Sequence, residues 1–302
     1  MKKSMLAPLA VAVSAFAVAG LAHAEDTLKK IKDTGTITEG VRESSGALAF
    51  TLGDGKYAGF HYDVCAKVIA DIQKQLGLAK LETKYQPVTS QNRIPLVQNG
   101  TVDIECGSTT NNATRQKDVA FAPALYVEDV HIAVKAGSGI TGIAGLNGKT
   151  VATTTGTTSV QLLRKNKRAA GMDFKELNGK DHSDSFLLLE SGRADAFVMD
   201  GQILAGLISK SKSPADYKIV GEPLSVEPIS IMYRKDDPAF KKAVDDSVRA
   251  LAKSGEVAKL YDKWFMQPIP PSNTKVGLPA SEATKAAWAN PTDKPLEEYA
   301  QP

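Results

Sequence analysis

Helical and strand patterns alternate along most of this chain, and this alternation constrains its fold more than any other feature. Val64, Val68 and Ile72 recur at helical spacing, whereas residues 36–41 and 194–199 are typical of strands. Alternating strands and helices predict an α/β fold with parallel sheets covered by helices on both faces. The pattern occurs in two sets, and 302 residues are enough to give each set its own core.

The order of the two sets predicts how the chain divides. We expect residues 25–130 and 224–302 to form a discontinuous first lobe, with residues 131–223 inserted as a second lobe. The chain would then cross between the lobes near residues 127–130 and 224–228, and these crossovers would form a two-strand hinge. From Gln267 onward the sequence is rich in proline and polar residues, which predicts an extended tail.

The first residues have the features of a secretory signal peptide. Lys2 and Lys3 precede an apolar stretch at residues 6–21, and Ala22-His23-Ala24 fits the small-residue cleavage pattern. We therefore expect residues 1–24 to be removed, with cleavage before Glu25, and the protein to be exported. The alternative is an uncleaved anchor, although the stretch is short for a membrane span.

Composition and charge narrow the classes of protein. Removing Lys2 and Lys3 from the formal net charge of +3 leaves +1, which argues against a nucleic-acid-binding protein. Apolar residues make up 42% of the chain and charged residues 24%, as in an ordinary soluble globular protein.

The chain has two cysteines, Cys65 on an expected helix and Cys106 at the end of an expected strand. Exported proteins meet an oxidising compartment, which favours a disulfide between them. The alternative is a pair of buried free thiols, because the sequence does not fix their distance. Their spacing fits neither a CxxC redox site nor a metal site.

Polar side chains follow several of the expected strands, where ligands bind in open parallel sheets. Arginine pairs with carboxylates, hydroxyls at helix starts favour anions, and one aspartate suits an ammonium group. Three arginines against one aspartate give an expected formal excess of +2. The set predicts a site for a zwitterion that carries one extra carboxylate. Its members are Arg42, Ser90, Arg93, Ser108, Thr110, Arg115, Thr158, His182 and Asp200.

Several of these residues, and Thr157 beside Thr158, also have a purely structural interpretation. A hydroxyl or carboxylate ahead of a helix can be only an N-cap, which applies to Ser90, Thr157 and Asp200. An arginine or histidine can be a solvated surface charge, which applies to Arg93, Arg115 and His182. Their joint occurrence at strand ends favours the binding site.

Motifs for other functions are weak. Residues 137–142 match GxGxxG, but no long helix follows and no acidic residue lies about 20 positions on, so we expect a loop. The chain has no GxSxG elbow and no HExxH motif, so we expect neither catalytic residues nor a metal or cofactor.

Several segments resemble the glutamate/aspartate-binding proteins of ATP-driven, ABC-type importers, within solute-binding protein family 3. The resemblance covers nearly the whole chain after the signal peptide. It implies a type II periplasmic-binding-protein fold and a soluble, periplasmic, monomeric protein that works with inner-membrane permease subunits. The segments that carry it are residues 42–45, 89–95, 106–112, 156–159, 180–186 and 189–194.

The resemblance also implies a role for each site residue. Arg115, Thr110 and Thr158 would hold the α-carboxylate of glutamate or aspartate. Asp200 and Ser108 would hold its α-ammonium group. The side-chain carboxylate would be surrounded by Arg42, Ser90, Arg93 and His182.

Two other classes of function remain as alternatives. Prephenate or arogenate dehydratases resemble these binding proteins, and such an enzyme would need a general acid, for which His182 or Asp200 is a candidate. A sensor or adhesion module would need an additional domain or an anchor. Neither alternative matches the residues as well as a transport-linked binding protein.

Overall fold

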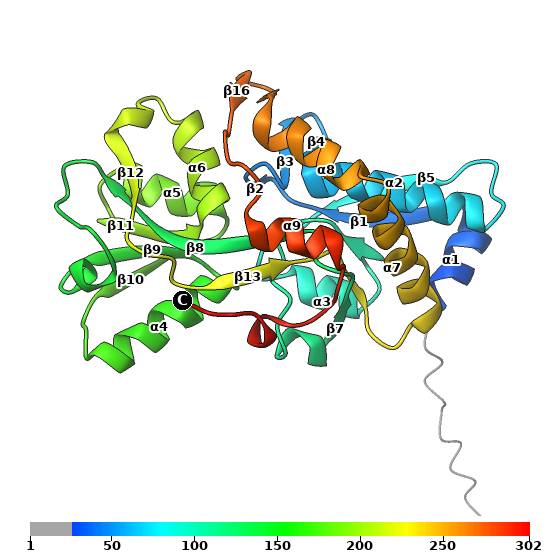
Figure 1. The fold of residues 1–302 in the computed structure, drawn as a ribbon, viewed down its shortest axis with the longest axis horizontal. Coiled ribbons are helices and arrows are strands. Elements are labelled where there is room, and N and C mark those ends of the chain that lie inside the picture. Colours follow the sequence, from blue (N-terminus) through cyan, green and yellow to red (C-terminus); the bar gives the residue numbers. More distant parts are fainter. Residues whose placement is uncertain (1–25) are drawn as a thin grey trace, which may run out of the picture.

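The computed structural model describes residues 26–302, so the expected signal peptide and its cleavage site lie outside the described residues. The described chain forms two α/β lobes, each built on its own sheet and flanked by helices (Figure 1). Within residues 26–302, no helix combines the length and apolar character needed to cross a bilayer.

The first lobe contains a five-stranded sheet in the order β5-β1-β6-β14-β7. These strands are β1 (Thr36–Val41), β5 (Glu82–Pro87), β6 (Ile104–Glu105), β7 (Val119–Phe121) and β14 (Met232–Arg234). A small sheet of β2 (Ser44–Ser45), β3 (Ala49–Gly53) and β4 (Lys56–Ala58) lies beside it. The helices of this part are α1 (Thr27–Thr34), α2 (Phe60–Gln75), α3 (Arg93–Gln98), the 3-10 turn η1 (Arg115–Lys117), α7 (Pro238–Lys253) and α8 (Glu256–Tyr261), which the π-helical turn η4 (Asp262–Met266) continues.

The second lobe contains a sheet in the order β10-β9-β11-β8-β12. These strands are β8 (Tyr126–Lys135), β9 (Thr150–Thr154), β10 (Lys175–Gly179), β11 (Ala196–Asp200) and β12 (Tyr217–Val220). The helices are α4 (Thr158–Ala170), α5 (His182–Glu190) and α6 (Gly201–Lys210), with 3-10 turns η2 (Ile143–Leu146) and η3 (Pro214–Asp216). Separate apolar clusters fill the two lobes. On this basis we propose that residues 131–223 form the second lobe and that the chain on either side of them forms the first lobe, as the sequence predicts.

Two strands connect the lobes side by side. The first half of β8 pairs antiparallel with β13 (Val226–Ile229), from Tyr126 opposite Ile229 to Asp129 opposite Val226. We call this pair the hinge strands, and both run across the middle of the molecule (Figure 1). Because the chain returns through them, β8 is antiparallel to β11, and β14 is antiparallel to β6. Each sheet is therefore mixed, with parallel pairs such as β1 with β5 and β9 with β10.

The tail expected after Gln267 is more structured than its composition predicts. It forms a short hairpin of β15 (Pro268–Ile269) and β16 (Thr274–Lys275), then helix α9 (Glu282–Ala289) and the 3-10 turn η5 (Leu296–Glu298). The hydroxyl of Thr284 accepts from the main-chain N–H of Val127 at 3.1 Å, and the indole of Trp288 donates to the carbonyl of Leu125 at 2.7 Å. These contacts hold α9 against β8.

One local interpretation is also corrected. Ser90 does not cap a helix, because α3 begins at Arg93 and Asn92 is its N-cap residue. After Ile229 the chain passes from β13 in the hinge to β14 in the first sheet.

Candidate functional site

The nine candidate residues lie at strand ends and helix starts between the two lobes. Eight of them are buried, and Thr158 is partly buried. Arg93, Arg115 and His182 are at most 9% exposed, so the surface-charge interpretation of these three residues is wrong.

Arg42 follows β1 and is the centre of a network that joins the lobes. Its guanidinium donates to Ser90 Oγ at 3.0 Å, to Ser108 Oγ at 3.4 Å and to Asp181 Oδ1 at 3.1 Å. It also lies 3.1 Å from Nε2 of His182, at the start of α5. Asp181 is a partner that the sequence analysis did not include in the site.

His182 serves as a neutral acceptor in this network. Burial, together with the charge of Arg42, lowers the pKa of His182 to about 3. Since an arginine can only donate, Nε2 accepts from Arg42, and Nδ1–H then donates to Thr154 Oγ1 at 3.0 Å. The imidazole therefore positions Arg42 rather than adding a positive charge.

Arg93 and Asp200 carry unmet polar atoms. Both residues are 2% exposed. Two nitrogens of Arg93, Nε and one terminal nitrogen, have no hydrogen-bond partner, and Oδ1 of Asp200 has none either. Burial, together with Arg115 and Arg42, lowers the pKa of Arg93, although an arginine stays protonated in proteins. Buried polar atoms without partners are costly, so these atoms indicate a place where a charged ligand supplies the missing hydrogen bonds.

Asp200 ends β11 and titrates close to neutrality. Burial and the nearby Glu227 raise its pKa to about 7, whereas Arg93 and Arg115 act in the opposite direction. Its side chain makes no N-cap hydrogen bond to α6, so the capping interpretation of Asp200 is not supported.

Arg115 and two threonines converge near the hinge. Arg115 donates to the carbonyls of Thr110 at 2.9 Å and Gly156 at 3.2 Å, and so bridges the lobes. The hydroxyls of Thr110 and Thr158 both donate to Oε2 of Glu227, at 2.6 and 2.8 Å. Glu227 lies on the hinge strand β13 and is 1% exposed.

The site contains more negative charge than the sequence analysis expected. Glu105 is fully buried, accepts from Thr109 Oγ1 at 2.6 Å and acts on both Arg93 and Arg115. With Asp181 and Glu227 it balances the arginines, so the expected excess of +2 is wrong. Two of these three acidic residues could have been noticed in the sequence, because Glu105 and Glu227 each lie between apolar residues of a strand segment.

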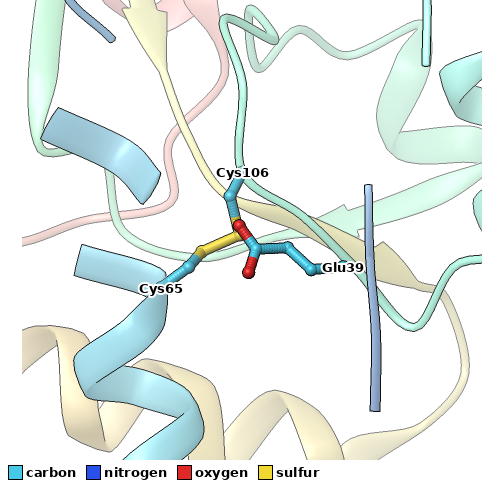
Figure 2. Close-up of side chains that lie close together, drawn as sticks. All are labelled: Glu39, Cys65 and Cys106. Carbon is cyan, nitrogen blue, oxygen red and sulfur yellow. A yellow bond between two sulfur atoms is a disulfide. The ribbon is translucent and has the colours of Figure 1, made fainter. Parts of the chain in front are cut away.

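The expected disulfide is confirmed. Cys65 on α2 and Cys106 after β6 are joined, with their Cα atoms 6.3 Å apart. Glu39 lies beside the bridge (Figure 2), and burial, with a contribution from Glu105, raises its pKa to about 8. Glu39, Cys65 and Cys106 are close enough to share a metal ion, but the two sulfurs are bonded to each other and offer no thiolate ligand.

These features define a binding protein for small charged solutes. The protein has two lobes, a two-strand hinge, and charged groups between the lobes whose polar atoms lack hydrogen-bond partners. Residues 37–267 match the model of the bacterial extracellular solute-binding proteins, family 3. The chain belongs to this family.

Comparisons with individual proteins agree with the family. The chain is 48% identical over 274 residues to an L-glutamate/L-aspartate-binding protein of Pseudomonas aeruginosa, covering 90% of each chain. It is 44% identical over 303 residues to a glutamate/aspartate import solute-binding protein of Escherichia coli K12, covering 98% of this chain and 99% of the relative. Among solved structures, a mutant of the arginine-binding protein from T. maritima superposes with a TM-score of 0.70 at 28% identity, covering 80% of this chain and 99% of that one.

Proposed function

We propose that this protein binds L-glutamate or L-aspartate between its lobes and delivers it to an ABC-type importer in the inner membrane. The observation that carries the proposal is that Arg93 and Asp200 are both buried and each keeps polar atoms without a hydrogen-bond partner. A ligand with a carboxylate and an ammonium group at opposite ends satisfies both residues. The names of the similar proteins from Pseudomonas aeruginosa and Escherichia coli support the same ligands.

Each candidate residue has a role in this proposal. Arg93 binds the side-chain carboxylate of the ligand, and Arg42, Ser90 and His182 complete that end of the site. Asp200 and Ser108 bind the α-ammonium group. The α-carboxylate is bound by Arg115, Thr110 and Thr158.

The two hydroxyls at the α-carboxylate end are already engaged. Thr110 and Thr158 donate to Glu227, and each hydroxyl has a single proton to donate. The ligand therefore competes with Glu227 for these protons, or accepts at this end from Arg115 and main-chain N–H groups. Arg115 donates to the Thr110 carbonyl in its own lobe and to the Gly156 carbonyl across the cleft, and so draws the lobes together around the ligand.

The first test is charge selectivity, measured by calorimetric titration of ligand-stripped protein. Glutamine has nearly the shape of glutamate but leaves the Arg93 guanidinium with only a neutral carbonyl. We expect glutamate or aspartate to bind at least about 100-fold more tightly than glutamine, or roughly 2.7 kcal/mol. Equal affinities for glutamate and glutamine would contradict the assignment of the side-chain end.

Two variants provide matched controls for this test. Arg93→Met should weaken glutamate and aspartate most, and so narrow the gap to glutamine. Arg115→Met should weaken all α-amino acids by a similar factor, because every one of them carries the α-carboxylate. If both variants behave alike, the two ends of the site are not distinguished as proposed.

The dehydratase alternative loses one of its two candidate acids, and only Asp200, with a pKa of about 7, could still carry a proton near neutral pH. With a pKa of about 3, His182 is neutral at pH 7 and cannot protonate a leaving hydroxyl. The similar proteins from Pseudomonas aeruginosa and Escherichia coli are binding proteins of transporters. Release of phenylpyruvate from prephenate would reverse this conclusion.

The family supports an inference about where the protein acts. We infer that the protein is exported to the periplasm after cleavage near Ala24 and acts as a monomer. Mass spectrometry of native protein would identify the first residue, and light scattering would give the molecular mass in solution.

A further inference from the structure

A second set of contacts joins the lobes at residues 44–47, which follow Arg42 in the first lobe. Gln202, in the first turn of α6, is fully buried against this segment. Its Oε1 accepts from the N–H of Ala47 at 3.1 Å, and its Nε2 donates to the carbonyl of Ser45 at 3.3 Å. The side-chain amide of the second lobe thus satisfies two main-chain groups of the first lobe.

Two glycines allow this close approach. Gly46 has a φ of +59°, and a Cβ there would lie 2.1 Å from Oε1 of Gln202. Gly206, one turn further along α6, faces it, and a Cβ at Gly206 would lie 3.3 Å from Cα of Gly46. A side chain at either position would press on the facing lobe.

Asp181 extends the contact on the other side of the segment. Its Oδ2 accepts from the hydroxyl of Ser44 at 2.7 Å, while its Oδ1 accepts from Arg42. Residues 44–47 are therefore held by α6 at one end and by the residue before α5 at the other.

We propose that these contacts form a closure latch, made of residues 44–47 with Gln202, Gly206 and Asp181. The latch stabilises the arrangement in which the lobes meet, and none of the groups at Gln202 or Gly206 has a role in binding the ligand itself. It raises the affinity for every ligand by the same factor and leaves the choice between ligands to Arg93 and its neighbours. The inference rests on the proposed function, because it assigns the latch to a site that binds amino acids.

The first test compares Gln202→Leu with the wild-type protein. Leucine keeps the bulk but removes both hydrogen bonds, and leaves Ser45 O and Ala47 N without partners. We expect the Kd values for glutamate and aspartate to rise together, by about tenfold or more, mainly through faster dissociation. Gln161→Leu, on the exposed face of α4, is the matched control and should leave both Kd values unchanged.

The second test uses Gly206→Ala, which should stabilise the ligand-free protein but weaken its binding of the ligand. Alanine inside α6 should raise the melting temperature of the ligand-free protein, because glycine is a poor helix former. The same methyl group presses on Gly46 and should weaken ligand binding several-fold. Kd values within about twofold of wild type in both variants, each melting cooperatively, would overturn the latch.

A ligand-independent measurement separates the latch from the proposed function. Spin labels at Lys80→Cys and Lys212→Cys, both exposed and on different lobes, report the inter-lobe distance, since the native cysteines are bridged. Gln202→Leu should shift the ligand-free distribution to longer distances, and an unchanged distribution would contradict the latch. A wild-type protein that binds no amino acid would instead refute the proposed function.

Discussion

At the scale of single residues, Asp200 is the proposed ligand-binding residue whose ionisation changes near neutral pH. It is buried, lacks a partner on Oδ1 and has a pKa of about 7 without ligand. An ammonium group placed beside it favours the ionised form. Binding below pH 7 must therefore release the proton of Asp200.

Glutamate affinity should consequently depend on pH. The Kd should rise as the pH falls below 7, by up to about tenfold per pH unit, and level off above about pH 8. His182 stays neutral over this range and the glutamate side chain titrates near about 4, so neither masks the effect. Titration calorimetry in two buffers of different ionisation enthalpy would measure the proton release.

Asp200→Asn is the control for this dependence. It should weaken binding strongly and also remove the proton release. A wild-type Kd that stays constant from pH 5 to pH 8 would show that Asp200 does not bind the ammonium group.

The residues that the sequence analysis missed share a physical reason. Strand-end reasoning finds side chains that point beyond a sheet, and it found Arg42, Arg93 and Asp200. Glu227 instead comes from the hinge strand, and Glu105 is the last residue of the two-residue strand β6. Their proximity depends on how the two lobes meet, which periodicity along one chain does not encode.

At the scale of elements, the disulfide ties helix α2 to the segment that carries Ser108 and Thr110. Cys65 lies within the buried face of α2, and Cys106 immediately precedes Gly107. A Cβ at Gly107 would lie 2.2 Å from Oε1 of Glu105, so a side chain at this position would press on the buried Glu105. The bridge therefore holds one wall of the site in place.

Removing the bridge should lower the free energy of unfolding. The cysteines are 41 residues apart, for which the chain-entropy model gives about 3–4 kcal/mol. Denaturant unfolding of Cys65→Ala/Cys106→Ala, compared with the oxidised wild type, would measure this loss. A midpoint equal to that of the wild type would show that the bridge constrains neither state.

Regular elements were predictable where the apolar pattern was strong, as in α2 and β11. Helix α9 was not, because its apolar residues are alanines apart from Trp288, and its position depends on Thr284 and Trp288 contacting the chain at β8. Ser90 was predicted as a cap because its type is typical of caps, but the buried Arg42 takes its hydroxyl as a partner.

At the scale of the whole molecule, the C-terminal segment joins parts that are distant in sequence. Asn111, one residue after Thr110, donates from Nδ2 to the carbonyl of Asp293 at 2.9 Å and accepts from the N–H of Leu296 at 2.9 Å. Further along, the side chain of Gln301 accepts from the N–H of Val226 at 3.1 Å and donates to its carbonyl at 3.0 Å. The segment thus braces the hinge strand next to Glu227.

Deleting residues 291–302 should weaken both stability and binding. The loss of these hydrogen bonds should lower the free energy of unfolding by about 1–3 kcal/mol. Glutamate affinity should fall several-fold, because Asn111 and Val226 adjoin Thr110 and Glu227. Unchanged melting and titration curves would show that the segment is only a surface covering. Lys285→Ala, on the exposed side of α9, is the control and should change neither property.

The placement of the two ends of the described chain matters for anyone who wishes to build a sensor from this protein. The first helix lies at the outer end of the first lobe, where the N–H of Thr27 donates to Asp237 at 2.9 Å, whereas the last residues lie along β13 (Figure 1). A fluorescent reporter fused after Pro302 would therefore sit on the moving joint and respond to the ligand, at some cost in affinity. One fused ahead of Thr27 would report location without disturbing capture.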